Sequence, residues 1–259
     1  MTALEAPAGS ILAALEGGRV RAAQPDPSVP GGWRVNPEVK AAILEQFREP
    51  ALEVWRVGPF TFRDRAAFAP RDLHSGDWRI VPGGTSVRAG AYLGAGVVVM
   101  PPSYVNVGAW LGEATMVDSH VLVGSCAQIG ARVHLAAGVL IGGVLEPPAG
   151  RPVIVEDDAF VGAGSTLLDG VLVGRAAVIG AGVTMTGTSR LFDLVRRRVL
   201  EGTADAPLAV PAGAVVVPGA RALRGAFAEG HGLHVATAVI IKDRDPGTAA
   251  RVALEDALR

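Results

Sequence analysis

The chain has 259 residues, which is long enough for one or two domains with a substantial buried core. A formal net charge of -1 and a pI near 6.5 argue against a nucleic-acid-binding surface as its main function. The single cysteine, Cys126, excludes an intramolecular disulfide and a multi-cysteine metal site, and it fits a reducing cytoplasm.

Residues 1–80 predict a small α/β domain. The first residues lack the basic start of a signal peptide, and no later apolar run is as long as a membrane helix. We therefore expect a cytoplasmic protein without a membrane partner. A short amphipathic helix is expected at 11–15, and a second helix should begin at Pro37 with Asn36 as its cap. The residues between 50 and 80, punctuated by proline, predict one or two strands.

A six-residue repeat follows. Every sixth residue is aliphatic, and the residue four places after each of these is small or aliphatic. A helix repeats about every 3.6 residues and a strand every 2, so neither explains the pattern. A β-solenoid does, because its short strands alternate with corners that need glycine or small residues. The aliphatic positions in the first part of the repeat are Val81, Val87, Leu93, Val99, Val105, Leu111, Val117, Val123, Ile129, Leu135 and Ile141.

The repeat is interrupted twice. The first interruption, 147–152, is rich in proline, and we expect a loop extruded from the wall of the solenoid. The second, roughly 192–209, carries several arginines and should be exposed. The solenoid domain is therefore expected to cover 81–221. Its later aliphatic positions are Val155, Val161, Leu167, Val173, Ile179, Met185, Leu191, Val210 and Val216.

The last part of the chain, 222–259, is predicted to cap the solenoid. It holds an apolar strand at 235–241 and an amphipathic helix at 249–258. A stack of coils leaves unpaired strand edges at both ends, and flanking segments can cover them. The expected fold class is mainly β: a parallel β-helix with an N-terminal α/β domain and a C-terminal cap of strand and helix.

Strings of residues inside the repeat are more specific than its period. They include MPPSYVNVG (100–108), TMVD (115–118), VGSCAQIG (123–130) and IGGVLEP (141–147). These strings resemble the tetrahydrodipicolinate N-succinyltransferase family, and the period resembles the hexapeptide repeat of left-handed parallel β-helix acyltransferases. The resemblance implies that hand for the coils. It also implies a succinyl-CoA-dependent enzyme of bacterial lysine and diaminopimelate biosynthesis.

The wall of the first part of the repeat is poor in charge. Between 81 and 146 the charged residues are Arg88, Glu113, Asp118, Arg132 and Glu146. A surface that faces water is normally richer in charge, so we expect other copies of the chain to cover part of this wall. The resemblance implies a homotrimer with active sites between subunits.

Asp118 directly follows an aliphatic position, where glycine or a small residue usually stands. An aspartate there could support a tight turn with its own carboxylate. It could also be a general base that takes a proton from a substrate amine as the amine attacks a thioester. In the family, the aspartate of this TMVD string contacts the substrate amine, so the resemblance implies a catalytic and substrate-binding Asp118.

Arg88 and Arg190 are candidates for binding the carboxylates of the substrate. A guanidinium group suits a dicarboxylate, and both arginines match family segments near substrate carboxylates. A surface salt bridge is the alternative for Arg88, and Arg190 also borders the arginine-rich insertion. Arg88 and Asp118 are five hexads apart, which is not a multiple of the three hexads per coil of the family. They should therefore lie on different faces, which supports a site between protomers.

His120, His134 and Cys126 have ordinary structural roles as their first interpretation. The γ-class carbonic anhydrases, a hexapeptide family, bind Zn²⁺ with three histidines. Two histidines in the wall cannot form such a site within one chain. We therefore expect no metal. His120 stands where the succinyltransferases usually carry tryptophan, and Cys126 is expected to be a packing residue.

CoA is expected to lie in a groove between adjacent β-helices, roofed by the extruded loop, as the resemblance implies. Small side chains would let the pantetheine arm approach the backbone, and backbone N–H groups would stabilise the thioester oxyanion. The candidates are Gly142, Gly143, Ala163, Ser165 and Ala181.

One departure from the family pattern leaves the acyl donor open. Family members commonly carry an Arg-Ser-Glu string in which the glutamate is implicated beside the aspartate, and this chain has Gly164 and Thr166 at those places. We expect transfer of a succinyl group from succinyl-CoA, as co-substrate, to the amine of a small dicarboxylate. The alternatives are an acetyl-CoA-dependent enzyme of the same fold and a non-catalytic trimeric scaffold.

Overall fold

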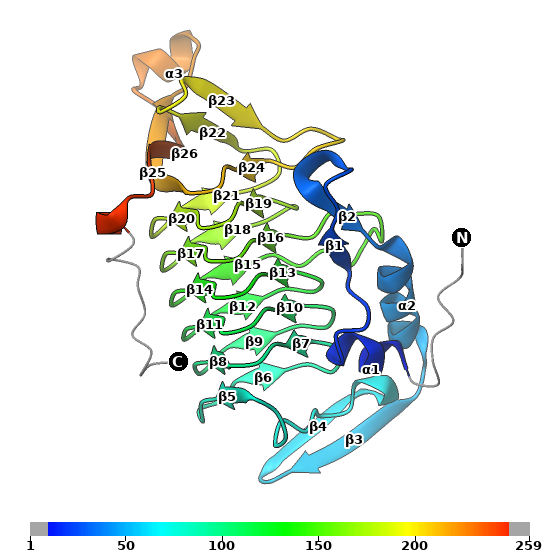
Figure 1. The fold of residues 1–259 in the computed structure, drawn as a ribbon. Coiled ribbons are helices and arrows are strands. Elements are labelled where there is room, and N and C mark those ends of the chain that lie inside the picture. The colour runs from blue at the N-terminus through cyan, green and yellow to red at the C-terminus, as the bar shows by residue number, and fades with distance from the viewer. Residues whose placement is uncertain (1–9, 249–259) are drawn as a thin grey trace.

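The computed structural model describes residues 10–248, and its body is a three-sided stack of coils made of short parallel strands (Figure 1). Sheet 1 contains β7 (Tyr92–Leu93), β10 (Trp110–Leu111), β13 (Gln128–Ile129), β16 (Ile154–Val155), β19 (Leu172–Val173) and β24 (Ala209–Val210). Sheet 2 contains β5 (Trp78–Ile80), β8 (Val97–Val99), β11 (Met116–Val117), β14 (His134–Leu135), β17 (Phe160–Val161), β20 (Val178–Ile179) and β25 (Ala214–Ala222). Sheet 3 contains β6 (Ser86–Val87), β9 (Tyr104–Val105), β12 (Leu122–Val123), β15 (Leu140–Ile141), β18 (Thr166–Leu167) and β21 (Thr184–Met185). The predicted parallel β-helix is confirmed.

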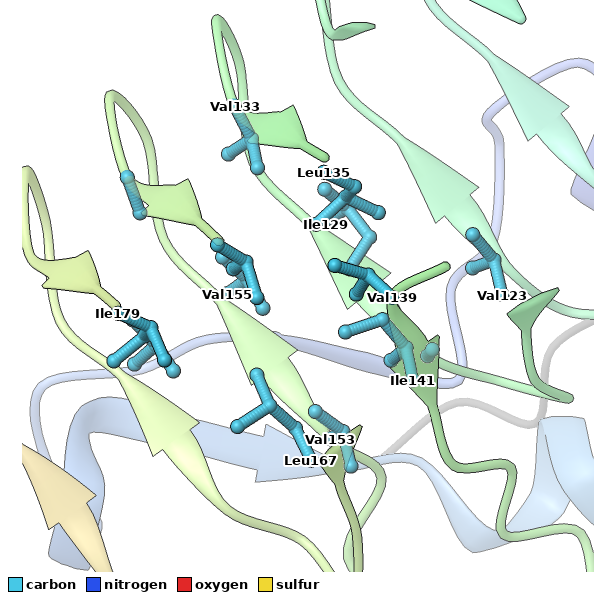
Figure 2. Packing of buried hydrophobic residues seen from close by; sticks show 14 of the residues in the cluster. Val123, Ile129, Val133, Leu135, Val139, Ile141, Val153, Val155, Leu167 and Ile179 are labelled. Atoms are coloured by element: carbon cyan, nitrogen blue, oxygen red, sulfur yellow. The ribbon is translucent and has the colours of Figure 1, made fainter. Parts of the chain in front are cut away.

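The aliphatic repeat fills the interior of the stack. One coil advances by 18 residues, as from Trp110 to its partner Gln128. Neighbouring side chains of a strand point to opposite sides, so the second residue of each two-residue strand points inward. Figure 2 shows these residues meeting across the interior from successive coils. The core includes Val99, Leu111, Val117, Ile129, Leu135, Ile141, Val155, Leu167, Ile179, Leu191 and Val216, each 0% exposed.

The first coil shifts the predicted register by one residue. Ile80, and not Val81, pairs with Val99 and packs against the core. The prediction that the inward row begins at Val81 is therefore wrong. Between this strand and β6 the backbone turns through Gly83 and Gly84, whose φ angles are 138° and 94°, and the regular six-residue spacing begins at Val87.

Both interruptions of the repeat leave the stack at the same corner, between sheet 3 and sheet 1. The first runs from the end of β15 to the start of β16. The second follows β21 and forms an antiparallel hairpin of β22 (Arg190–Asp193) and β23 (Arg198–Glu201) before the chain returns at β24. The chain thus leaves the stack near both places where the repeat is interrupted, and Arg196 to Arg198 at the tip of the hairpin are exposed. We call the corner between sheets 3 and 1 the loop corner.

The N-terminal segment lies along the side of the stack (Figure 1). Its elements are α1 (Ile11–Glu16), β1 (Ala23–Pro25), a 3-10 turn (Pro30–Gly32), β2 (Trp33–Val35), α2 (Pro37–Arg48), β3 (Leu52–Val57), β4 (Phe60–Arg65) and a 3-10 turn (Ala66–Phe68). Leu12, Leu15 and Ile43 pack with Val107 and Cys126 at the loop corner. The two predicted helices are confirmed, whereas residues 50–80 hold three strands, β3, β4 and β5, instead of the predicted one or two.

Asn36 is the N-cap residue of α2, as predicted, but its side chain makes no capping bond; its amide donates instead to the carbonyl of Arg21, 2.8 Å away. Arg21 crosses the outside of sheet 1, where its guanidinium lies 3.8 Å from the ring centroid of Trp110 and 5.4 Å from that of Trp33. The segment thus covers the outer face of sheet 1, and Gln128, Ile154 and Leu172 on that face are buried.

The C-terminal strands close one end of the stack. β25 pairs with β26 (His234–Asp243), which in turn pairs with β22, and α3 (Ala226–Gly230) lies in the connection. Leu191, Ala238 and Ile240 from these strands complete the interior core. The predicted strand at 235–241 is confirmed, and the predicted helix at 249–258 lies outside the described residues. No helix in residues 10–248 is long and apolar enough to cross a membrane.

Candidate active site

The outer face of sheet 3 is the most accessible of the three faces. The outward residues of sheet 1 lie under the N-terminal segment, and on sheet 2 Val98, Met116, Val178 and Val215 are buried. Each outward residue of sheet 3 is half-buried or exposed, and none of them is charged. These residues are Ser86, Tyr104, Leu122, Leu140, Thr166 and Thr184. An uncharged face of this kind suits a partner or a ligand better than bulk water.

Asp118 lies at the corner between sheets 2 and 3, which we call the Asp118 corner. Its side chain is half-buried, and Oδ1 accepts a 2.7 Å hydrogen bond from the N–H of Ser119. Its backbone carbonyl accepts a 2.8 Å bond from the hydroxyl of Ser103 inside the stack. Within the described part of the chain, no cation forms a salt bridge with this carboxylate. Asp118 therefore supports its turn and still presents a carboxylate oxygen at the edge of sheet 3.

A hollow of about 420 Å³ opens beside this corner. His120 and Leu122 line one side of it, and Ser86 and Tyr104 line the other. His120 has a φ angle of 62°, at the corner place that Gly138, Gly164 and Gly182 occupy in later coils. This hollow could not be predicted from the sequence, because only the stacking of coils brings Ser86 beside His120.

Ala163 and Ala181 lie on the same corner as Asp118, further along the stack. Backbone hydrogen bonds join the successive turns: Gly138 N–H to Ser119 O, Gly164 N–H to Ala137 O and Gly182 N–H to Ala163 O, each 2.9 Å. Both alanines are exposed. The structure thus brings three of the predicted site residues into one line.

Gly142 and Gly143 lie on the opposite edge of sheet 3, at the loop corner. They follow β15 directly, where the extruded loop begins. A Cβ atom on Gly143 would come within 2.4 Å of the backbone nitrogen of Ser125, so the turns approach each other too closely for a side chain here. The CoA candidates therefore flank sheet 3 on both sides.

Ser165 does not line the outer surface, so this part of the prediction is wrong. It is 0% exposed and points into the stack. Its hydroxyl donates to Gly180 O at 2.9 Å and accepts from the N–H of Val183 at 3.3 Å. Ser103 and Thr115 bridge adjacent coils in the same way. The signal was available, because all three stand four places after an aliphatic residue, where side chains point inward.

Arg88 lies at the loop corner, across sheet 3 from Asp118. The two residues occupy different corners, and one sheet separates them. The Arg88 guanidinium pairs with Asp64 at 2.6 Å and lies 4.3 Å from the ring centroid of Phe68. It also lines a second hollow, of about 450 Å³, that shares Ser86 and Tyr104 with the first. A substrate carboxylate at Arg88 would have to replace that of Asp64.

Arg190 lies far from Asp118 and Arg88 along the chain and the stack. It is exposed at the start of β22 and pairs with Glu201 of β23 at 2.6 Å. Within one chain, then, Arg190 does not meet the other two candidates. An exposed pair of this kind adds little stability, so the guanidinium can exchange its partner.

Cys126 and His134 have structural surroundings. Cys126 is buried among Leu12, Leu15 and Ile43, and burial raises the pKa of its thiol to about 12, so the predicted packing role is confirmed. His134 lies on the outer side of sheet 2, edge-on to Phe160 at 5.1 Å between ring centroids. In residues 10–248 no three His, Cys, Asp or Glu side chains gather as metal ligands.

Comparison with known proteins identifies the family. Residues 152–186 match the family model described as the hexapeptide repeat of succinyl-transferase. The chain is 41% identical to the 2,3,4,5-tetrahydropyridine-2,6-dicarboxylate N-succinyltransferase of Idiomarina loihiensis, over 96% of this chain and 87% of that protein. It is 38% identical to the enzyme of the same name from Polynucleobacter asymbioticus, over 96% and 88%. The chain belongs to the tetrahydropyridine-dicarboxylate N-succinyltransferase family.

The sequence strings predict membership of this succinyltransferase family, and the comparisons confirm the prediction. A solved structure described as a 2,3,4,5-tetrahydropyridine-2-carboxylate N-succinyltransferase of Campylobacter jejuni is similar in fold. Its TM-score is 0.55 at 19% identity, and the match covers 88% of this chain but only 61% of that one. At this identity the likeness concerns the fold alone.

Proposed function

We propose that this protein transfers a succinyl group from succinyl-CoA to the amine of tetrahydrodipicolinate in its open 2-amino-6-oxopimelate form, in lysine and diaminopimelate biosynthesis. Family membership at 41% identity is the observation that carries this proposal. The face of sheet 3 supports it, because an uncharged surface lies between a carboxylate on one edge and a glycine-rich turn with an extruded loop on the other. The acetyl-CoA enzyme and the non-catalytic scaffold are not favoured.

In the proposed reaction the substrate nitrogen attacks the thioester carbonyl carbon. The new C–N bond forms, the C–S bond breaks, and CoA leaves as a thiol after taking up a proton. Asp118 accepts the proton that the amine loses. The backbone N–H of Gly143 stabilises the negative charge on the thioester oxygen, and Ala163 and Ala181 leave room for the pantetheine arm. The N–H of Gly142 is not available for this role, because it donates to Leu167 O at 2.8 Å within the stack. No step in this scheme requires a metal.

Arg88 and Arg190 bind the substrate carboxylates in this proposal, after each releases its present acidic partner. Because the three charged candidates do not meet within one chain, the complete site lies between subunits of a homotrimer. The half-buried, uncharged face of sheet 3 supports an assembly of this kind. The left-handed sense of the coils, a cytoplasmic location and the division into 1–80, 81–221 and 222–259 belong to the same proposal.

The chain carries Thr166 where the family resemblance implies a glutamate, so a single carboxylate does the proton transfer in this proposal. Thr166 points outward from β18 on sheet 3, and no outward residue of that sheet is acidic. In this proposal Asp118 is the sole proton acceptor, because the outer face of sheet 3 holds no other acidic side chain that could take its place.

Two measurements test the proposal. Release of CoA thiol, followed with a thiol reagent, should require the amino dicarboxylate and succinyl-CoA, and should be much slower with acetyl-CoA. Light scattering should give about three times the 26.5 kDa of one chain. Equal rates with both donors would refute the donor assignment, and a monomer at micromolar concentration would refute the shared site.

A further inference from the structure

Lys40 of α2 is a buried lysine. Its side chain is 0% exposed, and Nζ donates to the carbonyl of Gly150 at 2.5 Å and to that of Pro147 at 3.5 Å. Burial lowers the pKa of this amine. Within the described residues it has no salt bridge to a carboxylate, whereas the other lysine of the chain, Lys242, pairs with Asp245 at the surface. Lysine is almost never fully buried unless its ammonium has hydrogen-bond partners, and these two loop carbonyls are the partners that stabilise the buried ammonium of Lys40.

The carbonyls that Lys40 contacts belong to the extruded loop between β15 and β16. The loop begins with a backbone bond from Val144 N–H to Ser125 O at 3.1 Å, and a turn closes between Gly150 N–H and Pro147 O at 2.8 Å. Among residues 10–248, Lys40 alone gives side-chain hydrogen bonds to the loop carbonyls from 146 to 150. The tip of the loop is therefore fastened to α2 through one ammonium group.

We propose that Lys40 is a positioning residue for the acyl donor: its ammonium holds the extruded loop in the shape that closes the donor groove at the loop corner. This inference rests on the proposed function, which places succinyl-CoA at Gly142 and Gly143. It connects the N-terminal segment to donor binding, although Lys40 itself contacts neither substrate. A cation is suited to this task because one ammonium has several donors: it bonds closely to Gly150 O and also reaches Pro147 O, which the turn already pairs with Gly150 N–H.

The experiment compares Lys40→Met with Lys242→Met in the full-length protein. Methionine keeps the length and apolar stem of lysine but cannot donate, and Lys242 provides the matched control because it is the only other lysine. For each variant we would measure the KM for succinyl-CoA, the KM for the amine substrate, kcat, and amide hydrogen exchange in residues 143–152.

For Lys40→Met we expect faster exchange in 143–152 and a KM for succinyl-CoA higher by a factor on the order of 10 to 100, the usual effect of losing hydrogen bonds to a charged group. The KM for the amine and kcat should stay within about threefold, and Lys242→Met should resemble the wild type on all four measures. Unchanged loop exchange, or a loosened loop with an unchanged KM for succinyl-CoA, would overturn the proposal.

A second variant guards against a Lys40→Met chain that fails to fold. In Gly150→Ala the new Cβ would lie 2.7 Å from Cγ1 of Val144 and 2.9 Å from the carbonyl oxygen of Pro147, so the loop must shift while Lys40 stays in place. The same rise in the KM for succinyl-CoA is expected, and a wild-type KM would again overturn the proposal. If the wild-type protein transferred no succinyl group, the proposed function would fail, and loop exchange would still show whether Lys40 is the anchor.

Discussion

Replacing Ser165 by alanine tests whether its hydroxyl stabilises the interior of the stack or lines the CoA groove. The hydroxyl makes two bonds inside the stack, one to Gly180 O and one from Val183 N–H. Each is worth about 1 kcal/mol, and a buried group left without a partner costs about 1–3 kcal/mol. One of the two lost bonds can be replaced, because Val183 N–H can donate to Gly180 O within its own turn. Val139 N–H makes the equivalent bond to Ala136 O at 3.2 Å. The net loss of stability is therefore about 1–2 kcal/mol.

For a chain of this size that loss lowers the midpoint of thermal unfolding by about 2–8 °C. The assay is thermal unfolding at a fixed protomer concentration, together with the KM for succinyl-CoA, which should not change. Ala163→Val is the opposite case: it is exposed, so stability should stay within about 0.5 kcal/mol, while the KM rises about tenfold. A Ser165→Ala protein with normal unfolding and a raised KM would refute the reasoning and return Ser165 to the groove.

Three further predictions concern the carboxylate, the loop and the buried thiol. Asp118→Asn should keep the fold, the assembly and the CoA affinity while kcat falls by roughly 10²–10⁴; a folded variant within a few-fold of the wild-type rate would exclude Asp118 as the base. Replacing 147–152 by a two-residue turn should weaken CoA binding measured by calorimetry, and an unchanged Kd would move the groove elsewhere. Burial raises the pKa of the Cys126 thiol from 9.0 to about 12, so the folded chain holds a proton that the unfolded chain loses. Stability should therefore fall between pH 9 and 12 by up to about 1.4 kcal/mol per pH unit, and Cys126→Ala should remove that share of the slope; identical slopes would contradict it.

The repeat could be predicted from the sequence because the interior of the stack is narrow and each strand contributes one inward aliphatic side chain at the same place in the hexad. Every sixth side chain from Val87 onward must fill the same narrow space, so the aliphatic spacing and the corners follow from the printed residues. The first coil departs from this spacing: Ile80 replaces Val81 as the inward residue, and the backbone then turns through Gly83 and Gly84 before Val87. The six-residue spacing alone does not show this shift, because Val81 also fits it.

The site was harder to predict, for two physical reasons. Whether a side chain points inward or outward depends on its place in the hexad; a small hydroxyl at Ser165 satisfies the backbone inside, while Ala163, two residues earlier, faces water. The partners of Arg88 and Lys40 come from segments more than 20 residues away, Asp64 and the 142–153 loop. No spacing rule within the repeat could show that α2 and β4 pack against the loop corner.

The loop corner also explains where this architecture accepts new sequence. From Gln128 to Ile154 the chain takes 26 residues for a step that elsewhere needs 18, and from Leu172 to Ala209 it takes 37, yet the strands on either side keep the same pairing. Each excursion leaves and returns along the loop corner, so its length is free while the stack stays rigid. A designer who wished to graft a recognition peptide onto this protein should choose the tip of the β22–β23 hairpin at this corner, because the Asp118 corner has only short turns and the first excursion adjoins the proposed donor site at Gly142 and Gly143.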